Sequence, residues 1–284
     1  MAEGFSLVDL KSVSEPVVKL IESVSKGIGA LYEPVGKVRN AKAEAKSKII
    51  LAEAGVKVDL VTSRALERVT HQEIRRQNNI DDIVRGAAGC LPPEVSSEEV
   101  DEDWIVNFFN LGQDIGNPQM QKIWSRLLAG EVAKPGSFES RTVQAVKSLS
   151  VDDAKLFTTL CGFSFVTDGG DRVLPLLSHA FFQYIRSNGL NTSAETHLKS
   201  IGLMHSDVIW YPAREPTKKI YLDYFSDTYC ARSSDGDERE TMQAVEAFPF
   251  TKIGVELAGI AGGQPSKKYI NHLLETGSLF LPDE

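Results

Sequence analysis

Residues 104–128, WIVNFFNLGQDIGNPQMQKIWSRLL, place large apolar side chains three or four positions apart. Side chains at that spacing lie on one face of a helix, so the first half predicts a helix beginning near Trp104. Asn117-Pro118 begins a second helix, because asparagine caps helices and proline fits their first turn. Both predicted inner faces carry aromatic side chains, among them Phe108 and Trp124. The stretch therefore predicts two helices that pack into a shared core.

Two more helices are predicted downstream of this stretch. Pro135-Gly136 forms a turn, Ser137 or Ser140 caps the helix that follows, and residues 150–153 cap the next one. Four short helices with an aromatic inner face are typical of a compact all-α bundle, which we expect over residues 89–165. The tryptophans are expected to lie in its core.

Several segments around this turn resemble a known family. They are AKAEAK (41–46), RALER (64–68), WSRLLAGE (124–131), KPGSF (134–138), RTV (141–143) and LSVDDAKLF (149–157). Together they resemble the signature of an uncharacterised bacterial family, domain of unknown function 2806, and the similarity extends over most of the chain. The central block is also similar to the abortive-infection alpha proteins, which are associated with defence against phage. The resemblance implies no catalytic residues and no cofactor.

The central block also contains candidates for a structural role at the corner between two helices. They are Trp124, Arg126, Glu131, Pro135, Gly136 and Arg141. Proline and glycine end one helix and allow the next to begin. We expect Arg126, Glu131 and Arg141 to form ion pairs at a partly buried edge of this corner.

The first 88 residues are predicted to form a long helical arm. Residues 17–31 have apolar side chains at helical spacing, with Ser14 as the N-cap. A second apolar stripe runs from Val38 to Val69 and is rich in alanine and valine. A continuous helix of about 45 residues would be about 68 Å long. So narrow a stripe requires a covering helix, supplied either by an antiparallel hairpin or by a second protomer.

The charge of the chain is unevenly distributed. Its formal net charge is −8, but residues 1–88 hold 14 basic and 12 acidic side chains, so the acidic excess lies in the remainder. That excess excludes a basic nucleic-acid-binding coat on residues 89–284. The local basic group is Lys37, Arg39, Lys42, Lys46 and Lys48. Either it is a solvated helix face, or it contacts an anionic surface such as a membrane or a nucleic-acid backbone.

The last third is predicted to mix helices and strands. One helix ends at Asn188-Gly189, and a second follows to Ile201. Residues 208–211 and 219–225 are strand-like and are expected to form a hairpin, which gives the element order of a winged helix. The second helix offers only His197 and Lys199 to a DNA groove, so a partner-binding module is favoured over a DNA reader. The predicted fold class is mainly α: a long helical arm (1–88), a small bundle (89–165) and a winged-helix-like α+β module (166–284).

The sequence provides no motif for catalysis. Neither the Gly-x-x-x-x-Gly-Lys phosphate loop nor the Gly-x-Gly-x-x-Gly dinucleotide motif occurs, and the histidines are scattered. Cys90, Cys161 and Cys230 are too far apart in sequence for a disulfide framework or a metal knuckle. A secretory leader and an 18-residue apolar run are also lacking, so a cytoplasmic location is expected. No cofactor or metal is predicted, and a non-enzymatic role is favoured.

The leading hypothesis is a homo-oligomerising interaction protein of bacteria that acts in phage defence or is carried by a prophage. One alternative is an effector that binds the periphery of the inner membrane through the helix at residues 17–31 and the basic group. Another is a nucleic-acid-binding regulator that uses the winged-helix-like module. An enzyme is the weakest alternative.

Overall fold

The computed structural model describes residues 14–29, 60–213, 219–231 and 244–282. The chain divides into two compact units, Met1–Ser148 and Leu149–Glu284. Candidate residues Lys37, Arg39, Lys42, Lys46 and Lys48 lie outside the described residues, as does most of the predicted second stripe of the arm.

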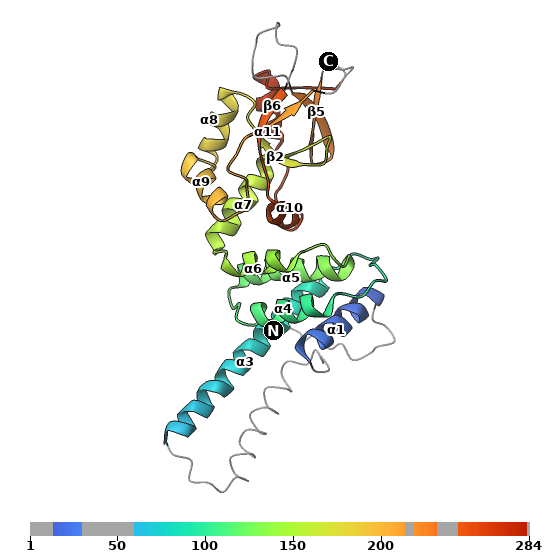
Figure 1. Cartoon of the computed structure of the whole chain (residues 1–284), viewed down its shortest axis with the longest axis vertical. Coiled ribbons are helices and arrows are strands. Elements are labelled where there is room, and N and C mark those ends of the chain that lie inside the picture. The colour runs from blue at the N-terminus through green and yellow to red at the C-terminus, as the bar shows by residue number, and fades with distance from the viewer. Residues whose placement is uncertain (1–13, 30–59, 214–218, 232–243, 283–284) are drawn as a thin grey trace. The chain divides into compact units, whose positions relative to one another are not determined.

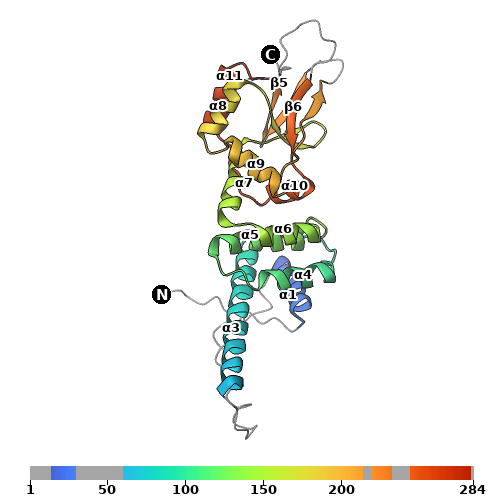
Figure 2. The ribbon, with the colours of Figure 1, turned by 60° about the vertical axis from the view of Figure 1, so that its left-hand side comes forward.

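The first unit is helical in its described residues (Figures 1 and 2). Its helices are α1 (Glu15–Ile28), α3 (Leu60–Ala88), α4 (Glu102–Gly112), α5 (Pro118–Ala133) and α6 (Ser140–Ser148). Both figures show the C-terminal part of α3 among the other helices and its N-terminal part extending away from them. The cap predicted for α5 is present, since the side chain of Asn117 accepts hydrogen bonds from the backbone of Gln119 and Met120, whereas Ser14 makes no capping side-chain hydrogen bond at α1.

The core of this unit is the aromatic cluster that the sequence predicted. Trp104 stacks on Phe108 with ring centroids 5.3 Å apart, and Phe108 contacts Trp124 at 5.0 Å. Trp124 is completely buried. Burial of such large rings is the main stabilising contribution to a bundle of this size.

Helix α1 covers part of this core. Leu20 and Val24 are buried, and the helix backbone approaches α4 closely at Gly27. A Cβ atom at Gly27 would lie only 2.7 Å from the ring of Phe109 and 2.8 Å from Ile105. Because the apolar face of α1 is already packed, insertion of this face into a membrane would first require α1 to leave α4.

The second unit combines helices with an extended sheet. The helices are α7 (Val151–Phe163), α8 (His179–Ser187), α9 (Thr192–Ser200), α10 (Lys252–Ala258) and α11 (Lys267–Glu275). The strands are β1 (Phe165–Thr167), β2 (Arg172–Pro175), β3 (Ile209–Pro212), β4 (Ile220–Tyr224), β5 (Asp227–Ala231), β6 (Ala244–Pro249) and β7 (Leu279–Phe280). They form one antiparallel sheet in the order β3-β6-β2-β1-β4-β5-β7.

This sheet shows that the predicted fold class was wrong. The protein is α+β with a seven-stranded sheet, not mainly α with a small winged-helix-like module. The predicted hairpin between residues 208–211 and 219–225 is not formed, because β3 pairs with β6 and β4 pairs with β1 and β5. Strands β1, β2, β5 and β7 were missed because two to five residues are too short to show a clear alternation.

The aromatic core of the second unit surrounds Tyr269 on α11. Its ring lies 5.0 Å from Phe163 and 5.7 Å from Tyr224, and the side chain is fully buried. Burial raises the pKa of Tyr269 well above its ordinary value, so the hydroxyl stays protonated. It donates a hydrogen bond to the carbonyl oxygen of Phe163 at 3.2 Å. This contact joins α11 to the end of α7.

The β4–β5 hairpin contains a strained residue at its tip. Phe225 has φ 55° and is 48% exposed. The left-handed conformation costs an L-residue other than glycine or asparagine about 1–2 kcal/mol. Strand pairing between Tyr224 and Asp227 leaves only two residues for the turn, which forces this conformation.

We therefore expect Phe225→Asn to raise the free energy of unfolding of the second unit by about 1 kcal/mol relative to Phe225→Ala. Both variants lack the ring, but only asparagine tolerates the backbone conformation. Urea titrations of the two variants measure the difference directly. Equal midpoints would show that the turn relaxes and stores no strain.

Candidate functional site

The corner between α5 and α6 is organised by the buried carboxylate of Glu131, which is 1% exposed. Its Oε1 accepts a hydrogen bond from the backbone N–H of Gly136 at 2.7 Å, and its Oε2 accepts one from Phe138 at 3.0 Å. Hydrogen bonds to an ionised acceptor are stronger than neutral ones. Glu131 therefore holds the Pro135-Gly136 turn against the end of its own helix.

The aromatic core supports the same turn. The indole Nε1 of Trp104 donates to the carbonyl oxygen of Phe138 at 2.7 Å. The ring of Phe138 packs over Gly130, where a Cβ atom would approach it to 2.7 Å. Gly136 has φ 80°, a conformation that favours glycine. The shape of this corner thus depends on buried contacts that stabilise the fold.

The two arginines expected at this corner lie on its surface. Arg126 is exposed on α5, and Arg141 is exposed and forms an ion pair with Glu139. Trp124 lies in the core, one turn of helix or more from the Pro135-Gly136 turn. The sequence did not predict that Glu131 accepts hydrogen bonds from two backbone N–H groups. Sequence patterns do not reveal which side chain binds the backbone N–H groups of a loop.

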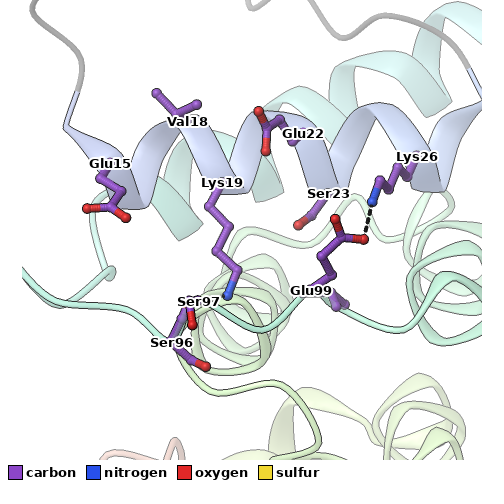
Figure 3. A pocket seen from close by; sticks show the side chains of 10 residues that line it. Glu15, Val18, Lys19, Glu22, Ser23, Lys26, Ser96, Ser97 and Glu99 are labelled. Atoms are coloured by element: carbon purple, nitrogen blue, oxygen red, sulfur yellow. Dashed lines mark hydrogen bonds and ion pairs between the residues drawn. The ribbon is translucent and has the colours of Figure 1, made fainter.

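A pocket of about 260 Å³ lies between α1 and the segment that leads into α4 (Figure 3). Lys19 reaches across it and donates to the carbonyl oxygen of Ser96 at 2.6 Å. Burial lowers the pKa of Lys19, although the charge of Glu98 opposes that effect. Farther along the helix, Lys26 forms an ion pair with Glu99 at 2.7 Å.

The polar contacts in this pocket attach α1 to the neighbouring segment. The ammonium groups of Lys19 and Lys26 are both engaged by that segment, while Glu15 and Glu22 line the open side. The described residues here contain no nucleophile hydrogen-bonded to a general base and no cluster of three metal-ligating side chains. These contacts therefore hold α1 against the neighbouring segment. One of them, between Lys26 and Glu99, joins residues 73 positions apart that no sequence motif connects.

A second polar cluster attaches α3 to the α4–α5 loop. The carboxylate of Asp114 accepts hydrogen bonds from Arg75 and from Arg76, each at 3.0 Å. The hydrogen bond from Arg76 is the main reason that the pKa of Asp114 is lowered. A carboxylate with a lowered folded-state pKa stabilises the fold above its unfolded pKa of about 3.9, and this contribution disappears as the pH falls through the folded value.

We therefore expect Asp114→Asn to make the first unit less stable at neutral pH, with the difference shrinking as the pH falls below about 4. Urea midpoints of the two proteins between neutral and acidic pH provide the measurement. A difference that persists unchanged at acidic pH would mean that the loss comes from packing and not from the charge.

The cysteines and histidines do not form a reactive site in the described residues. Burial raises the pKa of the Cys161 thiol to about 12, which keeps it protonated and unreactive. Cys90 is exposed. His197 contacts the capping residue Asp153 at 2.5 Å, so it stabilises the start of α7. Among the helices described, none has the length and apolar character needed to span a bilayer.

Within the described residues of the first unit, the N-terminal part of α3 carries exposed apolar side chains. In its C-terminal part, Ile83 and Ala87 are completely buried, and Ser125 of α5 donates to the carbonyl oxygen of Ile83 at 2.9 Å. The same face continues toward the N-terminus, since Val69 precedes Ile80 by three helical turns. There, Val61 is 64% exposed and Val69 is 49% exposed.

Comparison with known proteins identifies the family of this chain. A family described as "Protein of unknown function (DUF2806)" matches residues 63–274. The chain belongs to this family. The DUF2806 match includes nearly all of α3, the Glu131 corner and the sheet up to β6, whereas α1 precedes it. Neither curated proteins nor solved structures gave a match.

Proposed function

We propose that this DUF2806 chain is a non-enzymatic interaction protein that self-associates through α3. The observation that carries the proposal is the apolar packing face of α3, which α5 buries at one end and which is exposed at Val61 and Val69 toward the other. Val61 and Val69 are exposed on this face, and a solitary helix of this length gains little stability from its own hydrogen bonds. A partner helix would cover this face.

A second copy of the same chain is the partner that best fits the face. Residues of the second copy's α3 would pack on the same face that α5 covers farther along the helix. Small side chains such as Ala65 permit close approach of the two helices. An antiparallel arrangement brings the two uncovered ends together while the α5-covered ends point in opposite directions. A parallel arrangement would place the partner helix where α5 already lies.

The double variant Val61→Glu/Val69→Glu tests this proposal. Glutamates on the packing face would oppose burial, so sedimentation equilibrium of the full chain at micromolar concentration is expected to give a lower average mass than that of the wild type. Thr70→Glu is the control, because it places one added negative charge beside Val69 but on another face of α3.

The expected result is a wild-type mass for Thr70→Glu and a reduced mass for the double variant. Equal masses for all three proteins would contradict self-association through α3. A reduced mass for Thr70→Glu as well would assign the effect to the added charge and not to the packing face.

We also propose that this association serves defence against phage. The basis of this proposal is the resemblance to abortive-infection alpha proteins that we infer from sequence segments within residues 124–157. Plaque formation on cells expressing the wild type, Val61→Glu/Val69→Glu or Thr70→Glu tests the role. Protection by the wild type and the control, but not by the double variant, is expected. Equal plaque numbers with and without the wild-type protein across a phage panel would contradict it.

A further inference from the structure

The outer edge of β3 is the most apolar exposed edge in the described part of the second unit. Consecutive residues Val208, Ile209 and Trp210 are 37%, 45% and 61% exposed. Within the described strands, β3 pairs with β6 on one side only and ends the sheet. Its other side therefore presents backbone N–H and C=O groups that another strand could bind.

Strand β3 is short and ends at Pro212, but it lacks charged side chains, which are another usual protection against pairing. Sheet edges are commonly blunted by shortness, by charged side chains or by bulges. The opposite edge, β7, is protected by its length of two residues. By contrast, residues 208–212 carry no charged side chain, and Pro212 limits the strand at one end only.

We propose that β3 is a second self-association site, at which the β3 strands of two copies pair antiparallel across a two-fold axis. Strands that pair antiparallel with their own copy form an isologous contact, in which the same residues contribute from both sides. The chain has a net charge of −8, and an uncharged strand allows two acidic copies to approach without like charges facing each other.

The position of Trp210 favours a second copy over an unrelated extended peptide. Strand β3 is centred between Trp210 and Tyr211, so self-pairing places Trp210 of each copy opposite Tyr211 of the other. Aromatic pairs across neighbouring strands stabilise sheets, and exposed tryptophans are enriched among the residues that dominate interfaces. The added strands would join the two sheets into one continuous antiparallel sheet.

The short strand implies a weak contact. Stable protein interfaces bury about 1,200–2,000 Å² in total, and a single strand of this length covers less than that. We therefore expect concentration-dependent association. Since β3 and α3 belong to different units, a chain that uses both contacts would assemble beyond a dimer.

The variant Trp210→Lys tests the β3 contact. A lysine at this position lies opposite Glu246 within its own sheet, which preserves the fold, but it would replace the Trp210–Tyr211 pair across the proposed axis with a charged side chain. Val255→Lys is the matched control, because Val255 is 44% exposed on α10, away from the edge.

Sedimentation equilibrium of five proteins separates the two contacts. We expect species larger than a dimer for the wild type and for Val255→Lys. Dimers are expected for Trp210→Lys and for Val61→Glu/Val69→Glu, and monomers for the triple variant. If Val61→Glu/Val69→Glu is already monomeric, the β3 inference is overturned. If Trp210→Lys is monomeric, β3 association stands and the α3 proposal fails.

Hydrogen–deuterium exchange provides an independent measurement, because an exposed tryptophan that makes no strand pairing would not change the exchange of backbone amides. Backbone amides of residues 208–211 should exchange more slowly at high than at low protein concentration in the wild type, but not in Trp210→Lys. Exchange rates independent of concentration would overturn the proposal, whatever the measured mass.

Discussion

Replacing Glu131 with alanine is expected to lower the free energy of unfolding of the first unit by about 2–4 kcal/mol. The carboxylate accepts hydrogen bonds from the backbone N–H groups of Gly136 and Phe138, and alanine cannot replace either bond. A buried donor left without a partner costs about 1–3 kcal/mol. Because Phe138 also accepts the hydrogen bond of Trp104, loss of the turn would loosen the aromatic core.

Urea denaturation followed by tryptophan fluorescence measures this effect. Trp104 and Trp124 are buried in the first unit, whereas Trp210 is mostly exposed, so the change in emission reports chiefly on the first unit. Glu94→Ala is the control, because Glu94 is an exposed glutamate in the same unit. Glu131→Gln should be intermediate, since its amide offers one acceptor oxygen instead of two. Equal midpoints for Glu131→Ala and Glu94→Ala would contradict the clamp.

Gly254→Ala is expected to destabilise the second unit by about 3 kcal/mol. A Cβ atom at this position of α10 would lie 2.1 Å from the carbonyl oxygen of Leu203. That oxygen belongs to the backbone and accepts a hydrogen bond from Thr251, so it cannot move away without breaking the contact. Overpacking of this kind usually costs about 1–3 kcal/mol, and a backbone obstacle places the cost at the upper end.

Thiol labelling in increasing urea measures stability in the second unit specifically. Cys161 and Cys230 are buried there, whereas Cys90 is exposed and reacts at once. Gly259→Ala is the matched control, because its Cβ atom would lie 3.7 Å from its nearest neighbour. We expect Cys161 and Cys230 of Gly254→Ala to react at lower urea than those of the control. Labelling at the same urea concentration would show that α10 can shift without cost.

Local sequence predicted much of the helical structure. Asn117-Pro118 begins α5, and Ser150 and Asp153 form a capping box at α7. These features depend on residues within one helical turn, so they are recorded in the sequence itself. The burial of Trp104 and Trp124 followed equally from their helical spacing.

The sheet could not be predicted in the same way. Strand β6 lies between β3 and β2, and β1 lies between β2 and β4, so most neighbours are distant in sequence. A short strand such as β1, with three residues, is stabilised by its pairing partners and not by its own composition. The hairpin expected from adjacent strand-like runs failed for this reason.

The candidate sites show the same division. The sequence singled out Glu131 as a structural residue, but only the folded corner shows that its carboxylate holds two backbone N–H groups. The attachment of α1 through Lys26 and Glu99 joins segments with no local relation. The exposure of Val69 and Trp210 likewise depends on which segments pack against them in the fold.

The sequence by itself thus determined the helices of the bundle, their caps, the aromatic core and the family signature, because these depend on spacing and on neighbouring residues. Tertiary structure alone decided the seven-stranded sheet, the Glu131 clamp and the uncovered faces of α3 and β3. Strand pairing and burial are set by contacts between distant segments, whose free energies do not appear in any local pattern.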